Sequence, residues 1–188
     1  MNIDIDTSNL GPDKLEELVL HIAEMSERDT NFLSTKLNKL VWAADFACFC
    51  ETGSTISGAR YQREKFGPVP KAMPIILERL KEEERMEFRK VTVGTRKGLR
   101  PVALDAADLS RFSQRQLMIV DKVIAENFGK TGKQLSDESH DKLAWKVLEN
   151  GDAIPFAAWF VTSRQPTPAE RRSGLELEAL AKTFHGKA

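Results

Sequence analysis

The chain has 188 residues, of which 41% are hydrophobic and 30% charged, and its 28 basic and 28 acidic side chains give a formal net charge of zero. A domain of this length buries roughly 70% of the surface that its unfolded chain exposes, so we expect one domain. The neutral total argues against a protein that packages nucleic acid in bulk. No apolar run reaches the roughly 18 residues that a membrane-spanning helix needs, and the N-terminus MNIDIDTSNLG is acidic, so we expect a cytoplasmic protein without a membrane partner.

Three helices are predicted in the first half of the chain. Apolar residues at helical spacing after Pro12 predict an amphipathic helix over 12–26. A second helix is expected to begin near Ser34 and to stop by Gly53, and apolar side chains around most of it place it in the middle of the core. A third helix is predicted over 70–82, with its opening proline in the first turn, where a missing N–H costs little.

The second helix carries an acidic residue within its apolar part, together with both cysteines of the chain. Asp45 lies in an apolar segment, and a buried carboxylate needs a polar partner. We expect an arginine or tyrosine from the segment that follows, in a structural pairing rather than a catalytic one. Cys48 and Cys50 are two positions apart on a helix, so they point to nearly opposite sides and can neither form a disulfide nor easily share a metal.

The stretch YQREKFGPVPKA, residues 61–72, combines cations with two prolines that make a rigid elbow. Side chains on a stiff backbone lose little conformational freedom when a partner covers them. Tyrosine and arginine often carry interface energy, and the cations would suit an acidic partner. The alternative interpretation is that Tyr61 and Phe66 are core residues and the bases only keep the loop soluble. The predicted partner-binding residues are Arg60, Tyr61, Arg63, Lys65, Phe66 and Pro68.

A β-hairpin is predicted at about 88–104, where the short runs FRKVTV and LRPVAL flank the loop GTRKG. After the helix over 70–82, this hairpin gives an element order like that of a winged helix, in which the helix enters a DNA groove and the hairpin contacts phosphate. The helix, however, is apolar first and acidic later, and DNA repels acidic residues. A DNA-binding regulator is therefore the second interpretation, and its predicted contacts are Arg89, Arg96, Lys97 and Arg100.

Capping signals divide the second half of the chain. Ser113 and Gln116 form a capping box that starts a fourth helix. The run FGKTGK at 128–133 is not a phosphate loop, because Ile124 occupies the position that needs glycine. Its first glycine instead ends one helix, and its threonine starts the next. A last capping box at 167–170 opens a C-terminal helix.

The sequence shows no arrangement typical of an active site. His21, His140 and His185 fit no metal-ligand spacing, and a Gly-x-Ser-x-Gly motif is missing. The cluster at 136–141 places serine, histidine and aspartate side by side, but a catalytic triad is assembled from distant segments. We interpret it as a helix junction. We therefore predict a protein that is not an enzyme, with no catalytic residue, no metal and no cofactor.

Three stretches carry a resemblance to a known family: KLNKLVWAADF at 36–46, ISGARYQREKFGPVPKA at 56–72 and LSDESHDKLAWKVLENGDAIPF at 135–156. Together they resemble the Panacea domain of the SocA-like antitoxins, which is also found among phage-associated proteins. The similarity runs from about Leu33 to about Phe160. It implies a mainly helical domain that neutralises a cognate toxin by direct contact, and at least one member of the family delivers its toxin to a protease instead.

The predicted elements and the resemblance together indicate how the chain is organised. We expect a mainly α fold, a compact single-domain helical bundle with one small hairpin and some winged-helix-like element order. An acidic segment, 1–30, should pack on a Panacea-like domain at 31–163, and 164–188 should form a C-terminal helix or tail. The expected role is that of an antitoxin whose partners are a toxin and, in a delivery role, a protease or chaperone. Trp42 departs from the family pattern, in which tyrosine is common there.

Overall fold

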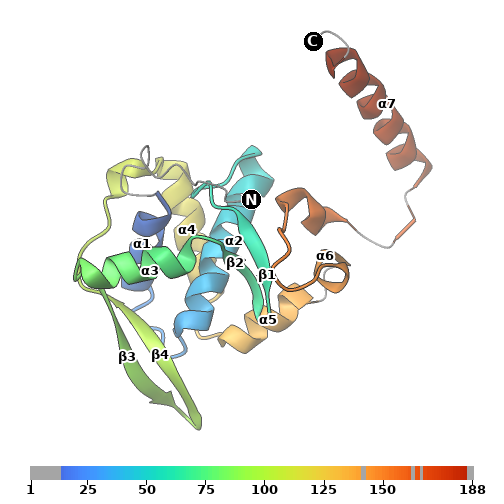
Figure 1. Ribbon diagram of the computed structural model, residues 1–188. Coiled ribbons are helices and arrows are strands. Elements are labelled where there is room, and N and C mark those ends of the chain that lie inside the picture. The colour runs from blue at the N-terminus through green and yellow to red at the C-terminus, as the bar shows by residue number, and fades with distance from the viewer. Residues whose placement is uncertain (1–13, 141–142, 162–163, 166, 186–188) are drawn as a thin grey trace, which may run out of the picture.

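The computed structural model describes residues 14–140, 143–161, 164–165 and 167–185 (Figure 1). It is mainly α-helical, as predicted. The elements in chain order are α1 (Lys14–Met25), α2 (Ser34–Thr52), β1 (Tyr61–Glu64), β2 (Gly67–Pro70), α3 (Met73–Glu82), β3 (Met86–Val93), β4 (Arg96–Ala103), η1 (Leu109–Arg111), α4 (Gln114–Glu126), α5 (Gly132–His140), α6 (Leu143–Val147), η2 (Phe156–Phe160) and α7 (Pro168–His185).

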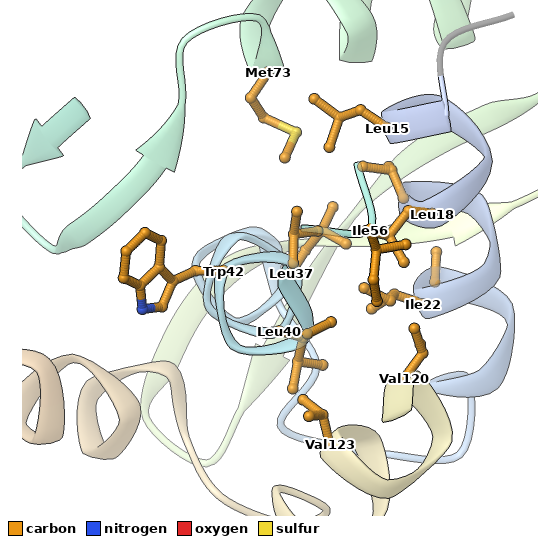
Figure 2. Close-up of a cluster of buried hydrophobic side chains, with 14 of the residues drawn as sticks. Leu15, Leu18, Ile22, Leu37, Leu40, Trp42, Ile56, Met73, Val120 and Val123 are labelled. Carbon is orange, nitrogen blue, oxygen red and sulfur yellow. The ribbon is translucent and has the colours of Figure 1, made fainter. Parts of the chain in front are cut away.

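Helix α2 is the centre of the fold, as its all-round apolar pattern predicts. Helices α1, α4 and α5 and strand β2 pack around it. Figure 2 shows how the core forms, with Leu37 and Leu40 of α2 facing Leu18 of α1 and Val120 of α4. Each fully buried side chain of this size contributes roughly 1.5–3 kcal/mol to folding. The helix ends at Gly53, whose φ of 77° is a left-handed conformation that glycine adopts without strain.

Local capping signals predict several helix ends correctly. Ser113 and Gln116 make both hydrogen bonds of the capping box at the start of α4. The run at 128–133 also behaves as predicted, because the turn after α4 has a left-handed glycine and Thr131 exchanges capping bonds with Gln134 at the start of α5. The capping box at 167–170 is present at the start of α7.

The hairpin predicted at about 88–104 is confirmed as β3–β4, with Met86 opposite Ala103 and Val93 opposite Arg96. The hairpin packs against the segment before α2, since a Cβ added at Gly98, which lies opposite Val91 toward the tip, would meet the Leu33 side chain at 2.8 Å. In Figure 1 its tip projects away from the helices.

A second hairpin was not predicted. The elbow forms the antiparallel pair β1–β2, in which Tyr61 lies opposite Pro70 and Glu64 opposite Gly67. The prediction that Pro70 opens the third helix is therefore wrong. Pro70 is instead the last residue of β2. The proline in the first turn of α3 is Pro74.

The C-terminal helix α7 stands away from the helical body in Figure 1. The described side chains at 168–176 are exposed, including Leu175 at 67% exposure. Within the described residues, no helix is both long and apolar enough to span a bilayer. The acidic residues at 1–13 and the end of the C-terminal tail at 186–188 lie outside the described residues.

Candidate functional site

Asp45 is fully buried and anchors the segment that leads into the elbow. Its carboxylate accepts hydrogen bonds from the backbone N–H groups of Ile56 and Ser57, both at 2.8 Å, and from the Ser57 hydroxyl. The Tyr61 hydroxyl donates a fourth, at 2.7 Å, which confirms the expected tyrosine partner. Burial raises the pKa of the Asp45 carboxyl, although these hydrogen bonds act in the opposite direction. The cluster is closed to solvent and therefore structural.

Asp45→Ala should lower the free energy of unfolding by about 3 kcal/mol, because it leaves the N–H groups of Ile56 and Ser57 and the Ser57 hydroxyl without this acceptor, and leaves the Tyr61 hydroxyl only its longer bond to the Val41 carbonyl, at 3.4 Å. Urea unfolding followed by circular dichroism measures this loss. Tyr61→Phe is the matched control. It removes one hydroxyl but keeps the ring against Trp42, 4.8 Å away between centroids, so it should cost only about 1 kcal/mol. Equal losses in the two variants would contradict this account.

The elbow is held rigidly by a distant segment of the chain. Strand β1 exchanges backbone hydrogen bonds with residues 151–154, since Arg63 N–H donates to Asp152 and Ile154 N–H donates to Tyr61, at 2.8 and 2.9 Å. At the tip, the Ser136 hydroxyl of α5 donates to the Phe66 carbonyl at 2.6 Å. The tip is therefore fixed from two sides before any partner arrives.

Arg63 holds α6 and the turn that follows it. Its guanidinium lies over the Trp145 ring, 4.3 Å from the centroid, and donates to the Trp145 carbonyl at 3.2 Å. A further hydrogen bond reaches the Asn150 side chain. Arg63 is half-buried, and its guanidinium makes these contacts within the protein.

The predicted partner-binding residues divide into an inner and an outer group. Tyr61 is only 2% exposed and Pro68 is buried, so neither side chain is available on the surface. This matches the alternative interpretation for Tyr61, whereas Phe66 is 57% exposed and is not a core residue. Arg60 and Lys65 are exposed, and the Lys65 ammonium lies 5.4 Å from the centre of the Phe66 ring. We call Lys65 and Phe66, at the tip of the β1–β2 hairpin, the elbow surface, while Arg60 lies at the open end of that hairpin.

The predicted nucleic-acid contacts lie on or beside the β3–β4 hairpin, and three of the four are engaged within the protein. Arg100 donates to the carbonyls of Glu27 and Asp29, at 3.1 and 2.8 Å, and so supports the α1–α2 loop. Arg89 pairs with Glu87, and Arg96 donates to the Asn31 side chain at 3.0 Å. Lys97 is exposed.

The winged-helix alternative also fails to gain support from α3. The exposed residues of this helix include Ile75, Glu78 and Glu82, and its exposed base Lys81 is paired with Glu78 at 2.9 Å. An apolar and acidic surface is unsuited to a DNA groove, whose phosphates repel carboxylates.

Two lysines one turn apart on α2 are both buried, but only one is paired. Lys36 is 1% exposed and donates to the Asp29 carboxylate and to the carbonyls of Asn127 and Lys130, at 2.6 and 2.7 Å. It therefore ties the α1–α2 loop to the end of α4. Lys39 is 4% exposed, and its ammonium nitrogen has no acceptor among the described residues. Burial lowers the pKa of Lys39 from its ordinary value of 10.5 to about 7.

Lys39 lines a pocket of about 300 Å³ between α2, α4, α5 and η2. This site was not predicted from the sequence, because Lys36 and Lys39 occupy equivalent places in the segment KLNKL. The available signal was the apolar pattern around α2. If most sides of a helix are buried, some of its lysines must be buried as well.

The comparisons with known proteins give one result. A family model for the SocA-like antitoxins, Panacea domain, matches residues 37–146. The chain belongs to this family. The search of curated proteins and the search of solved structures each returned no match.

The Panacea match covers more than half of the chain, although it is shorter than the expected span of 33–160. It runs from α2 to α6, so it includes the Asp45 cluster, both hairpins, the elbow surface and Lys39. Helices α1 and α7 and the turn η2 lie outside it. Among the residues the structure describes, no three histidine, cysteine or acidic side chains come together to hold a metal ion. The histidine side chain of the 136–141 cluster is outside what is described.

Proposed function

We propose that this Panacea domain neutralises a cognate toxin by binding it directly. The family match over residues 37–146 is the observation that carries the proposal, because the family is that of the SocA-like antitoxins. Binding of this kind requires a rigid, exposed surface and no chemical step within the antitoxin. The proposed partner is a protein toxin encoded next to this chain.

The elbow surface is the proposed docking site. Its backbone is fixed by residues 151–154 and by Ser136, so a partner that covers it orders little further backbone. Phe66 supplies an exposed aromatic anchor, and Lys65 beside it supplies positive charge. This combination suits a toxin surface with an apolar pocket rimmed by carboxylates. Tyr61 and Arg63 support this surface from within.

The double variant Lys65→Ala with Phe66→Ala should weaken toxin binding by roughly 10- to 100-fold, as expected when an interface anchor and its neighbouring charge are removed. Isothermal titration with the purified toxin measures the affinity, and toxin-dependent growth arrest measures neutralisation. The matched control is Lys97→Ala with Phe128→Ala, which removes one exposed lysine and one phenylalanine that is 58% exposed elsewhere. Equal toxin affinities of the two double variants would contradict the elbow surface as the docking site.

An antitoxin could also act by delivering the toxin to a protease instead of inhibiting it by binding. Inhibition by binding blocks toxin activity in a purified mixture of the two proteins. Delivery requires a protease and shortens the toxin's lifetime in cells. A purified complex in which the toxin stays fully active, with rapid toxin loss in cells, would replace inhibition with delivery.

DNA binding is a second candidate, and the projecting β3–β4 hairpin with its exposed Lys97 favours it (Figure 1). A protein held by phosphate contacts loses affinity steeply as salt rises. The test measures binding of the full chain to its own promoter between low and physiological salt. Salt-dependent binding that is lost when Arg96 and Lys97 are both changed to alanine would support this function beside toxin binding.

A further inference from the structure

The pocket beside Lys39 has mostly apolar walls. Helix α2 contributes Trp42 and Phe46 to its walls, together with two alanines, Ala43 and Ala47, whose small side chains leave the space open. Trp159 of η2 forms another wall, and its ring lies edge-on to Trp42 with the centroids 4.9 Å apart. A volume of about 300 Å³ is at the lower end of the range for small-molecule sites.

The polar groups of the pocket differ in whether they are already satisfied. The Asn127 amide donates to the Val123 carbonyl at 2.7 Å and accepts from Lys130 at 3.1 Å. Glu126 is exposed and lies 3.9 Å from Lys122. Lys39 is the one described lining residue with a buried nitrogen that lacks an acceptor. A buried ammonium without an acceptor is unfavourable, so this group is available for a ligand.

We propose that this pocket binds a small organic carboxylate with a flat apolar body, and that Lys39 donates to the carboxylate. Aromatic walls hold the apolar body, and the flexible lysine stem brings the ammonium to the ligand's charged end. A cationic ligand would be repelled by Lys39. A phosphate, with its greater charge and its need for several charged donors, is poorly suited to walls formed mostly by aromatic and small apolar side chains, in which Lys39 is the only cation among the described lining residues. The site is independent of the elbow surface and of the proposed toxin.

Cinnamate is the probe for this site, and two compounds with the same body serve as matched ligands. Cinnamyl alcohol is neutral, and cinnamylamine is cationic. Titration calorimetry of the full chain should give an affinity for cinnamate about tenfold or more above that for cinnamyl alcohol, the effect of one charge-assisted hydrogen bond. Cinnamylamine should bind most weakly. Equal affinities for the acid and the alcohol, or no binding of either, would overturn the proposal.

Three variants test the residues. Lys39→Met should reduce cinnamate binding to the level of cinnamyl alcohol, while the alcohol's affinity stays unchanged. Ala47→Leu fills the pocket and should weaken both ligands, which provides a second test that leaves the lysine in place. Lys97→Met removes an exposed lysine on β4, outside the pocket lining, and should leave all three affinities unchanged. Undiminished cinnamate binding by a folded Lys39→Met protein, or by Ala47→Leu, would place the ligand elsewhere and refute the proposal.

Discussion

Lys36→Met should lower the free energy of unfolding by roughly 3–5 kcal/mol, the cost of breaking a buried ion pair by removing one partner. Lys36 satisfies the Asp29 carboxylate, which is 3% exposed, and two carbonyls at the end of α4. Methionine fills a similar volume but donates no hydrogen bond. The carboxylate would keep its bonds from the backbone N–H groups of Asn31 and Gly129 but would lose its counter-charge. Urea unfolding at pH 7 measures the loss.

Lys122→Met is the control for this measurement. Lys122 is exposed on α4, and its nearest acidic partner lies 3.9 Å away on the same helix. Exposed pairs of this kind contribute about 0.3–0.5 kcal/mol. A loss below about 1 kcal/mol for Lys36→Met would mean that the buried pair barely offsets the free energy of desolvating its charges.

Lys39→Met should have the opposite effect and raise the free energy of unfolding by roughly 2–4 kcal/mol at pH 6. Lys39 sits one turn from Lys36 on the same helix and is also buried, but its ammonium has no acceptor among the described residues. The folded protein therefore bears the desolvation of a charge that nothing compensates. Methionine removes that charge and keeps the apolar stem. Lys36→Met and Lys39→Met make the same chemical change. The difference between their effects on the free energy of unfolding therefore measures the contribution of the hydrogen-bond acceptors.

The pH dependence of this gain follows from the pKa of Lys39, which burial lowers from 10.5 to about 7. Between these two values the unfolded chain binds the proton and the folded protein does not, so wild-type stability rises with pH in this window. The advantage of Lys39→Met should be largest below pH 7 and should shrink steadily toward pH 10. Unfolding curves at pH 6, 8 and 9.5 test this. A gain that does not change with pH, or a loss at every pH, would contradict the assignment.

A lysine that lowers stability calls for a functional reason. Proteins retain destabilising groups where binding needs them, and the proposed carboxylate site supplies such a need. If cinnamate binds through Lys39, the ligand should stabilise the wild-type protein against unfolding and should stabilise Lys39→Met much less. The stability and binding measurements on Lys39→Met therefore test the role of the Lys39 ammonium independently of each other.

Elements that depend on neighbours in the chain were predicted from the sequence. The helix start at Ser113 and the helix end at Gly53 need only residues within one turn, and both form as expected. Helix α2 was placed in the core because its apolar pattern leaves no polar side. Asp45 required a polar partner wherever it was buried, and a tyrosine of the elbow supplied it.

The elbow and the pocket were decided by contacts between distant segments. Strands β1 and β2 were missed because four-residue strands with two prolines gain their order from residues 151–154 and from α5. Tyr61 and Phe66 lie in the same short stretch, yet one is buried and the other exposed. Lys36 and Lys39 are equivalent in the sequence pattern. Lys36 donates to backbone carbonyls about ninety residues away, whereas the Lys39 ammonium has no acceptor among the described residues. The chain thus determines which residues are apolar or charged and where helices begin and end, while only packing determines which buried charge finds an acceptor, because hydrogen bonds depend on distances that local sequence does not set.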